Sequence, residues 1–173
     1  MAGLLIPASR LDAQALNAMI RRNERRLASC FPGLLRAGES LGATRAHLDL
    51  HRACERSGRS WLSGISAPDG DLAGLLFLNS INPDTGVAEA AGVLDADHEG
   101  RGLMRGAMRE VFDLARERLG LARVRFLIAP DNARSLAMAE ALGFRREDRP
   151  PRRFAAGASR EVLMNYYLLK LRS

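Results

Sequence analysis

The first third of the chain carries apolar residues at the spacing of amphipathic helices. Asp12 is a typical N-cap residue and is predicted to begin the first helix, which ends at residues 31–33 (Phe-Pro-Gly). A second helix is predicted from its cap Ser40 to residues 57–58 (Ser-Gly), and residues 3–10 form a short predicted strand ahead of both. The apolar positions of the first helix are Leu16, Met19, Ile20 and Leu27.

The apolar pattern changes to that of strands after residue 60. Residues 60–66, 72–81 and 87–94 are predicted as three strands. They are separated by segments 68–70 (Pro-Asp-Gly) and 82–86 (Asn-Pro-Asp-Thr-Gly), which are rich in turn residues. Connections this short predict an antiparallel meander.

Helices and strands alternate in the last third. A long helix is predicted over residues 101–119 with Gly120 as its terminator, followed by a buried strand over 124–129. Asp131 or Asn132 caps another predicted helix that ends at Gly143, Phe144 begins a further strand, and 162–171 is the last strand. These elements predict one mixed α/β (α+β) domain over residues 1–173. Its twisted, largely antiparallel sheet has about seven strands and is flanked by about four helices.

Composition is that of a globular protein, with 47% apolar and 27% charged residues. No apolar run is long enough to span a membrane, and the N-terminus has no basic region ahead of its short apolar run, so we expect neither a membrane span nor a secretory signal. Cys30 and Cys54 are the only cysteines, which predicts buried thiols in a reducing compartment, the cytoplasm.

The formal net charge is +6, and Lys170 is the only lysine. An excess of arginine favours a partner rich in phosphate or carboxylate, such as a nucleotide, ribosomal RNA or an acidic peptide. A general bias toward arginine explains the same composition, because the arginines are spread along the chain. Aromatic residues are only 5%, so contact with RNA has no stacking motif to support it.

The connection between the strand that ends at Leu94 and the long helix contains Gly100 and Gly102. Two glycines at such a turn let the backbone approach a ligand closely. The first N–H groups of a helix have no partners within it, and the helix dipole adds positive potential, so the turn is suited to a pyrophosphate. Tight turns that bind nothing also need glycine, and a third glycine and a downstream acid, which a dinucleotide fingerprint requires, are missing.

Further along, the chain reads Ala-Pro-Asp-Asn-Ala-Arg-Ser at 129–135 and Glu-Ala-Leu-Gly-Phe at 140–144. Together with the two glycines, these segments resemble the GNAT superfamily of N-acetyltransferases. The phosphate loop of that superfamily reads Gln/Arg-x-x-Gly-x-Gly/Ala and is followed by an Asn-x-x-Ser helix and a Leu-Gly-Phe exit. Within it, the chain looks most like the ribosomal-protein-alanine acetyltransferases of the Rim type. The resemblance covers nearly the whole chain and implies an acetyl-CoA-dependent acyltransferase with a splay between the fourth and fifth strands.

The resemblance also implies a cofactor site. The backbone of Val93 and Leu94 would pair with the pantetheine arm, Asn132 would contact the arm, and Ser135 would lie close to its sulfur. The pyrophosphate loop would consist of Glu99, Gly100, Arg101, Gly102, Leu103, Met104 and Arg105, with backbone N–H groups as donors. No metal is implied.

Four positions depart from the family pattern. Glu99 stands where Gln or Arg is usual, and a carboxylate near a pyrophosphate is unfavourable unless its side chain turns away. Met104 replaces a small residue of the wider superfamily. Ala139 stands where many relatives keep a tyrosine acid, which leaves Ser135 as the best proton donor for the thiolate. Cys30 occupies a place where the Rim type often has Trp beside the acceptor site.

The expected reaction is attack of a neutral amine on the thioester carbonyl. The backbone N–H of Leu94 is expected to stabilise the oxyanion. Glu89, with Glu161 second, is the candidate base that takes the proton of the amine. Glu89 is alternatively a salt-bridged or solvated strand residue, and Ser135 a first-turn residue that bonds backbone N–H groups.

His47 and His51 share a helix face at the spacing that zinc sites use, but no third ligand accompanies them, so we expect a surface pair and no metal. The match to the Rim type favours a protein or peptide N-terminal α-amine as acceptor, ribosomal proteins included. A small-molecule amine is the alternative within enzymes, and a non-catalytic acyl-CoA-binding or RNA-associated module is a rival. The sequence leaves the oligomeric state open between monomer and homodimer.

Overall fold

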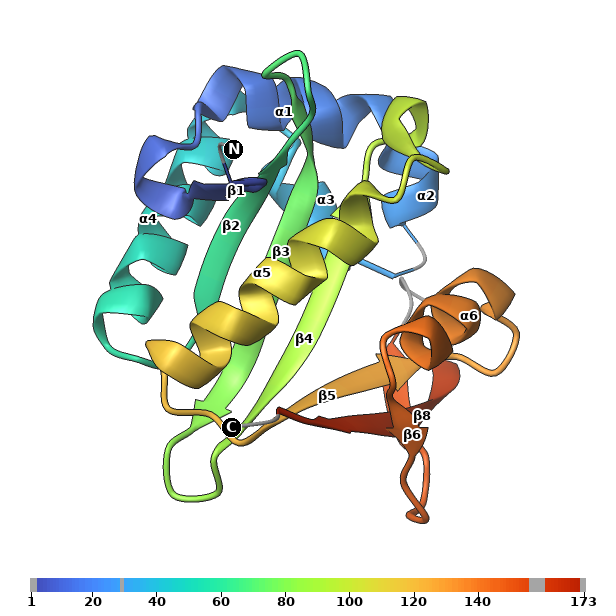
Figure 1. Cartoon of the computed structure of the whole chain (residues 1–173). Helices are drawn as coiled ribbons and strands as arrows, with labels where there is room; N and C mark the ends of the chain where they lie inside the picture. The colour runs from blue at the N-terminus through green and yellow to red at the C-terminus, as the bar shows by residue number, and fades with distance from the viewer. Residues whose placement is uncertain (1–2, 29, 156–160, 172–173) are drawn as a thin grey trace.

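The computed structural model describes residues 3–28, 30–155 and 161–171. Helices and strands alternate along the chain (Figure 1). Their order is β1 (Leu5–Pro7), 3-10 helix η1 (Ala8–Arg10), α1 (Ala13–Arg22), α2 (Glu24–Leu27), α3 (Pro32–Ala37), α4 (Leu41–Arg56), β2 (Trp61–Ser66), β3 (Leu72–Asn82), β4 (Val87–Leu94), 3-10 helix η2 (Ala96–His98), α5 (Leu103–Glu117), β5 (Arg123–Ile128), α6 (Ala133–Ala141), β6 (Arg145–Arg146), β7 (Arg152–Ala155) and β8 (Glu161–Lys170).

The strands form one mixed sheet in the order β1-β2-β3-β4-β5-β8-β6, and β7 pairs with the remaining length of β8. All neighbours are antiparallel except β4 and β5. Short turns join β2, β3 and β4, as their Pro-Asp-Gly and Asn-Pro-Asp-Thr-Gly sequences predict. The predicted fold class, a largely antiparallel sheet flanked by helices, is therefore confirmed.

The sheet splits between its two parallel strands. Only the three residue pairs from Val87↔Arg123 to Glu89↔Arg125 join β4 to β5, whereas β4 stays paired with β3 as far as Leu94. Figure 1 shows β4 and β5 diverging as a V from this point. The edge of β4 from Ala91 to Leu94 that faces away from β3 therefore has no strand partner, which confirms the expected splay.

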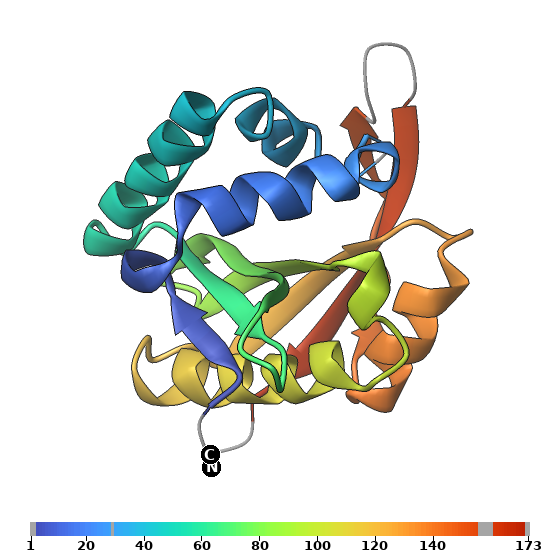
Figure 2. The ribbon, with the colours of Figure 1, turned by 90° about the horizontal axis from the view of Figure 1, so that it is seen from above.

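Helices cover both faces of the sheet (Figure 2). α1 and α4 lie on one face, and α5 and α6 on the other. The buried stripe of α5 consists of Leu103, Ala107, Met108, Val111 and Ala115 and packs in the core of its own face. In the described part of the chain, no helix has the length and apolar character that a membrane crossing requires.

The N-terminal helices are more broken than the apolar spacing predicts. α1 ends at Arg22, and Asn23 leaves helical geometry with φ −103° and ψ 13° before the single turn of α2. The Phe-Pro-Gly segment does not end a helix but begins one. Proline at a first helical position needs no N–H and has a suitable φ, so Pro32 starts α3. The described chain thus has six helices instead of about four.

The end of the sheet also differs. The strand predicted from Phe144 is only the two-residue β6, and β7 was not predicted. β7 is rich in arginine and has no apolar alternation, and it forms because Arg152 to Ala155 pair with β8. Tertiary pairing here overrides local sequence preference.

Candidate active site

The open edge of β4 presents backbone groups at alternate residues. The Asp95 N–H donates to the Ala73 carbonyl at 2.8 Å, so residue 95 exchanges bonds with β3. In an antiparallel ladder such pairs alternate along the strand, which directs the N–H and C=O of Val93 to β3 as well. Gly92 and Leu94 then present theirs to the open edge. Of the two residues predicted to pair with a pantetheine arm, Leu94 faces the splay, and Val93 does not.

The turn into α5 has the conformation that its glycines predict. Gly100 and Gly102 have φ of +75° and +74°, the left-handed region, and no atom lies within 4 Å of a Cβ built at either position. Glycine is required here by backbone conformation and not by crowding. Gly102 is the N-cap of α5, and no described side chain caps this helix end. The first turn holds Arg105 and no acid, so it is electropositive and suited to an anion.

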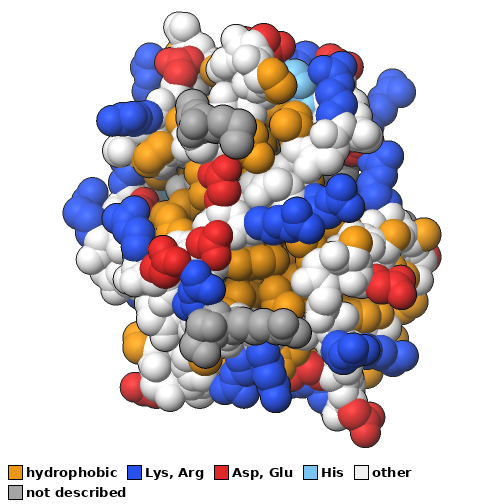
Figure 3. Space-filling model, in the orientation of Figure 1, with side chains coloured by type: hydrophobic (Ala, Val, Ile, Leu, Met, Phe, Trp, Pro, Cys, Tyr) orange, Lys and Arg blue, Asp and Glu red, His pale blue; other side chains and the backbone are white. Residues whose placement is uncertain are grey.

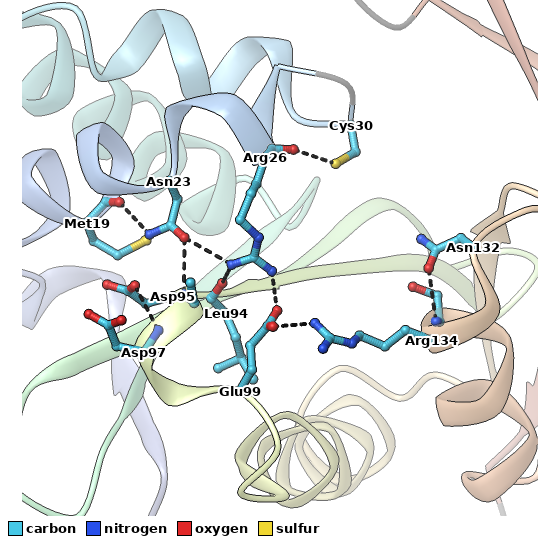
Figure 4. A network of polar contacts seen from close by, with 12 residues as sticks. Met19, Asn23, Arg26, Cys30, Leu94, Asp95, Asp97, Glu99, Asn132 and Arg134 are labelled. Carbon is cyan, nitrogen blue, oxygen red and sulfur yellow. Dashed lines mark hydrogen bonds and ion pairs between the residues drawn. The ribbon is translucent and has the colours of Figure 1, made fainter.

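Glu99 immediately precedes this turn, and its side chain turns to two arginines. Arg26 of α2 and Arg134 of α6 both form ion pairs with its carboxylate (Figure 4). α2 and α6 come from the two sides of the splay, and Glu99 joins them. The electrostatic conflict expected of an acid in a pyrophosphate loop is thereby neutralised in the unliganded protein.

Arg26 also holds the end of β4. Its Nη1 donates to the Leu94 carbonyl at 3.2 Å and to Oδ1 of Asn23 at 3.0 Å. The same Asn23 oxygen accepts from the Ala96 N–H at 3.1 Å, and its amide donates to the Met19 carbonyl at 2.9 Å. The break between α1 and α2 thus places a buried amide where it can fix the strand end (Figure 4). Sequence reasoning missed Asn23 and Arg26, because nothing local distinguishes them from other polar residues of a helix.

Asp95, the residue after β4, is held by α1. It is buried, and Arg22 pairs with it at 2.6 Å. Burial by itself would raise the pKa of Asp95, but hydrogen bonds from Arg22, Asn23 and the Asp97 backbone bring the pKa below its ordinary value. Asp95 therefore stays ionised, and this charge ties α1 to the end of β4.

Glu89, the candidate base, lies at the apex of the splay. Its carboxylate accepts hydrogen bonds from Nη1 of Arg152 at 3.1 and 3.3 Å, so the salt-bridged alternative describes its unliganded state. Its neighbour Arg125 donates to Glu147 at 2.6 Å, which raises the pKa of the guanidinium. The second candidate, Glu161, forms an exposed pair with Arg153 on the β7–β8 hairpin. Of the two acids, Glu89 is the one on β4.

The α6 residues lie across the splay from β4. Asn132 caps α6, since its Oδ1 accepts from the Ser135 N–H at 3.1 Å. Ser135 is half-buried in the first turn. Ala139 is buried in the core, at 1% exposure. Its methyl side chain cannot donate a proton, so this position does not supply the acid that the family pattern places there.

Met104 packs over the open strand. A Cβ at Gly92 would lie 3.0 Å from Met104 Cε and 2.7 Å from Leu76 Cδ2. The long side chain of Met104 fills the space that glycine leaves on β4, which explains how a large residue is accommodated at this position of α5.

His47 and His51 are not a surface pair. Their rings lie 4.5 Å apart, and that of His51 is 5.6 Å from Phe77, which stacks on Phe31. Burial, and to a smaller extent His51, lowers the pKa of His47 to about 4, and burial also lowers that of His51. Cys30, next to Phe31, is exposed rather than buried as predicted.

Hydrophobic side chains gather on the face that Figure 1 presents. Figure 3 shows them in the middle of this face, near the gap between β4 and β5, and both basic and acidic side chains surround them. Within residues 3–28, 30–155 and 161–171, no cluster of three or more His, Cys, Asp or Glu could hold a metal ion. An apolar cleft that leads to an electropositive helix end suits a ligand with an apolar arm and a phosphate group.

This combination of splayed sheet and glycine-bearing helix end is that of an acetyltransferase. Residues 4–145 match the family model described as "Acetyltransferase (GNAT) domain", and the chain belongs to this family. It is similar to YdaF of Bacillus subtilis (strain 168), a protein provisionally named as a ribosomal N-acetyltransferase. The two are 31% identical over 112 residues, which are 63% of this chain and 61% of YdaF.

Two solved structures share the fold. The ribosomal-protein α-N-acetyltransferase RimL, in complex with coenzyme A, has a TM-score of 0.85 at 21% identity, with 96% of this chain and 93% of that chain covered. Spermidine N-acetyltransferase of Vibrio cholerae has a TM-score of 0.72 at 18% identity, with 96% and 92% covered. Proteins with a polypeptide and a polyamine acceptor thus share this fold, so the fold by itself leaves the acceptor open.

Proposed function

We propose that this protein transfers the acetyl group of acetyl-CoA to the N-terminal α-amine of a protein or peptide. One observation carries the proposal: the unpaired edge of β4 leads, through the short segment 95–101, to the uncapped, glycine-bearing N-terminus of α5. An open edge offers hydrogen bonds to the amides of a pantetheine arm, and the helix end offers N–H groups to its pyrophosphate. Leu103, Met104 and Arg105 supply those N–H groups, while Asn132 and Ser135 line the opposite side.

The geometry of β4 bears on which backbone N–H stabilises the oxyanion. Glu89 and Leu94 are five residue steps apart along β4, roughly 17 Å at the rise of a β-strand. Leu94 and Glu89 therefore cannot serve one reacting carbonyl, and Leu94 belongs with the arm near the pyrophosphate loop. Ladder bonds of parallel strands are slanted, so Arg125 engages Ala90, and Gly92 has the first open N–H beyond the last pair. We assign the oxyanion contact to Gly92 in place of Leu94.

The acceptor amine must lose a proton. Glu89 is about three strand residues from Gly92, roughly 10 Å, so it accepts the proton through water after Arg152 has moved away. Ser135 is the proposed proton donor to the leaving thiolate. An α-amine has a reference pKa of about 7.7–8.0 and is partly neutral near pH 7.5, whereas a lysine amine near 10.4 needs a stronger base. Among the residues that the structure describes, none is placed at this site for direct deprotonation of the amine, which favours the α-amine.

Free thiol released from acetyl-CoA, measured against a panel of acceptors, tests the proposal. Peptides with a free Ala or Ser N-terminus should react faster than the same peptides with blocked N-termini and an internal lysine, and mass spectrometry locates the acetyl group. Turnover with spermidine alone would support the small-amine alternative, which the polyamine acetyltransferase of the same fold favours. Coenzyme A binding without turnover on any amine would contradict the enzymatic proposal.

A further inference from the structure

Glu99 occupies an unusual electrostatic position. Its carboxylate is mostly buried, with 23% of the side chain exposed, although it lies on a surface loop. Its two partners, Arg26 and Arg134, are more exposed, at 40% and 72% of their side chains. Glu99 thus already forms the ion pairs with Arg26 and Arg134 that an anionic ligand in the splay could otherwise form with these two arginines.

Glu99 is close in sequence to the N-terminus of α5. It lies directly before Gly100 and three residues before Gly102, the N-cap of α5. The proposed pyrophosphate and the Glu99 carboxylate are thus anions that approach one helix end. The first turn of α5 itself contains no acid. Glu99, just before this turn, is therefore the acidic residue that a pyrophosphate at the helix end would meet first.

We infer that Glu99 is an internal competitor of the cofactor: its carboxylate holds Arg134 and Arg26 in the unliganded protein, and the pyrophosphate displaces it from Arg134. The inference rests on the function proposed above. Arg134 is assigned the exchange because it is the more exposed partner and, among the residues that the structure describes, pairs only with Glu99, whereas Arg26 is also bonded to Leu94 and Asn23. Arg26 remains a positioning residue that holds the end of β4.

Because Glu99 competes with the pyrophosphate for Arg134, the affinity of the protein for coenzyme A is lower than it would be without this carboxylate. Removing the Glu99 charge removes its repulsion of the phosphates and releases Arg134 to bind them. At a partly exposed site, where interactions are screened, the expected gain is about tenfold in affinity. The variant should also depend more steeply on ionic strength, because one more arginine–phosphate pair forms on binding.

Calorimetric titration of coenzyme A into Glu99→Gln tests this inference. The matched control is Glu117→Gln, which removes the same charge from an exposed ion pair with Arg116 at the opposite end of α5. We expect Kd to fall about tenfold in Glu99→Gln and to stay unchanged in Glu117→Gln. Thermal unfolding without ligand shows whether both variants are folded.

A double-mutant cycle assigns the released cation. Arg134→Gln should weaken binding by a larger factor in the Glu99→Gln background than in the wild type, where Glu99 already holds this arginine in the unliganded state. Equal or weaker binding by folded Glu99→Gln overturns the inference, and additive effects overturn the role of Arg134. No binding of coenzyme A to the wild type would instead reject the proposed function, so the two failures are distinguishable.

Discussion

Glu89 of β4 and Arg125 of β5 are the last two residues that face each other before the parallel strands separate. Their position decides where the site lies. Beyond Ala90 the edge of β4 is open, and the backbone groups proposed for catalysis lie along that edge, whereas Ser135 of α6 lies across the splay from it. The candidate base is therefore at the apex of the splay, whereas the turn that is proposed to bind phosphate is at its mouth.

Gly92→Ala should impair both stability and turnover. The added Cβ would lie 2.7 Å from Leu76 and 3.0 Å from Met104, closer than packed carbon atoms approach. Overpacking of this kind costs about 1–3 kcal/mol, so the free energy of unfolding should fall by that amount in chemical denaturation. The acetylation rate should also drop, because the side chains of Leu76 and Met104 must move beside the open edge of β4.

A matched glycine serves as control for that substitution. Gly42→Ala in α4 has only Ser40 Oγ within 4 Å, at 3.7 Å, and should stabilise the protein by roughly 0.5–1 kcal/mol. Met104→Ala combined with Gly92→Ala should recover part of the lost rate. No recovery would contradict the role of Met104 as the residue that fills this space.

Gly102→Asp should abolish the rise in melting temperature that acetyl-CoA produces in the wild type by binding the folded state. The variant places a negative charge at the N-cap of α5, where the pyrophosphate is proposed to bind. Gly120→Asp introduces the same residue at φ +63°, past the other end of the helix, with similar backbone strain. Differential scanning fluorimetry should show the ligand-induced rise in Gly120→Asp only. An equal rise in both variants would sink the assignment of the loop.

Ser135→Ala should lower kcat by roughly 100-fold while the affinity for acetyl-CoA changes far less, since a positioned acid contributes about that factor. Steady-state kinetics and calorimetry on the same preparation separate the two effects. The Asn132 cap bonds the backbone of residue 135 and not its hydroxyl, so the helix should remain intact. An unchanged kcat would show that Ser135 is structural and that water protonates the sulfur.

Stability should fall between about pH 6.5 and pH 4 through His47. Its pKa is about 4 in the folded protein against 6.5 as the ordinary value, so the unfolded chain binds the proton more readily throughout this window. The contribution is fully present above pH 6.5 and is lost as the pH falls toward 4. His47→Gln should flatten this part of the profile of melting temperature against pH. The same slope in the variant would assign the effect to other groups, such as His51.

Much of the fold and part of the site follow from local sequence. The α5 stripe, the turn residues between β2, β3 and β4, and the caps Asp12, Ser40 and Asn132 each act within a few residues, and all three side chains accept the bond that a cap accepts. The turn at Gly100 and Gly102 also follows from local sequence, because glycine can adopt a left-handed φ without steric cost.

The remaining site residues depend on distant segments. Arg26 and Glu99 are 73 positions apart, and so are Arg22 and Asp95. Glu89 and Arg152 are 63 positions apart. No periodicity in one segment specifies such pairs, which exist only because the sheet order brings α1, β4 and the β7–β8 hairpin together. The same order decides which backbone groups of β4 are open, since that depends on where β5 leaves it.

The sequence by itself therefore determined α4, α5 and α6, the meander and the glycine turn that is proposed to bind phosphate, since each results from short-range sterics, apolar spacing and backbone hydrogen bonding. Only the tertiary structure decided that Gly92 and Leu94, and not Val93, face the splay, that Glu99 is held between two arginines, and that Glu89 is paired with Arg152. The physical reason is that strand register and charge pairing are set by the neighbouring chain segment, whose identity the local sequence does not encode.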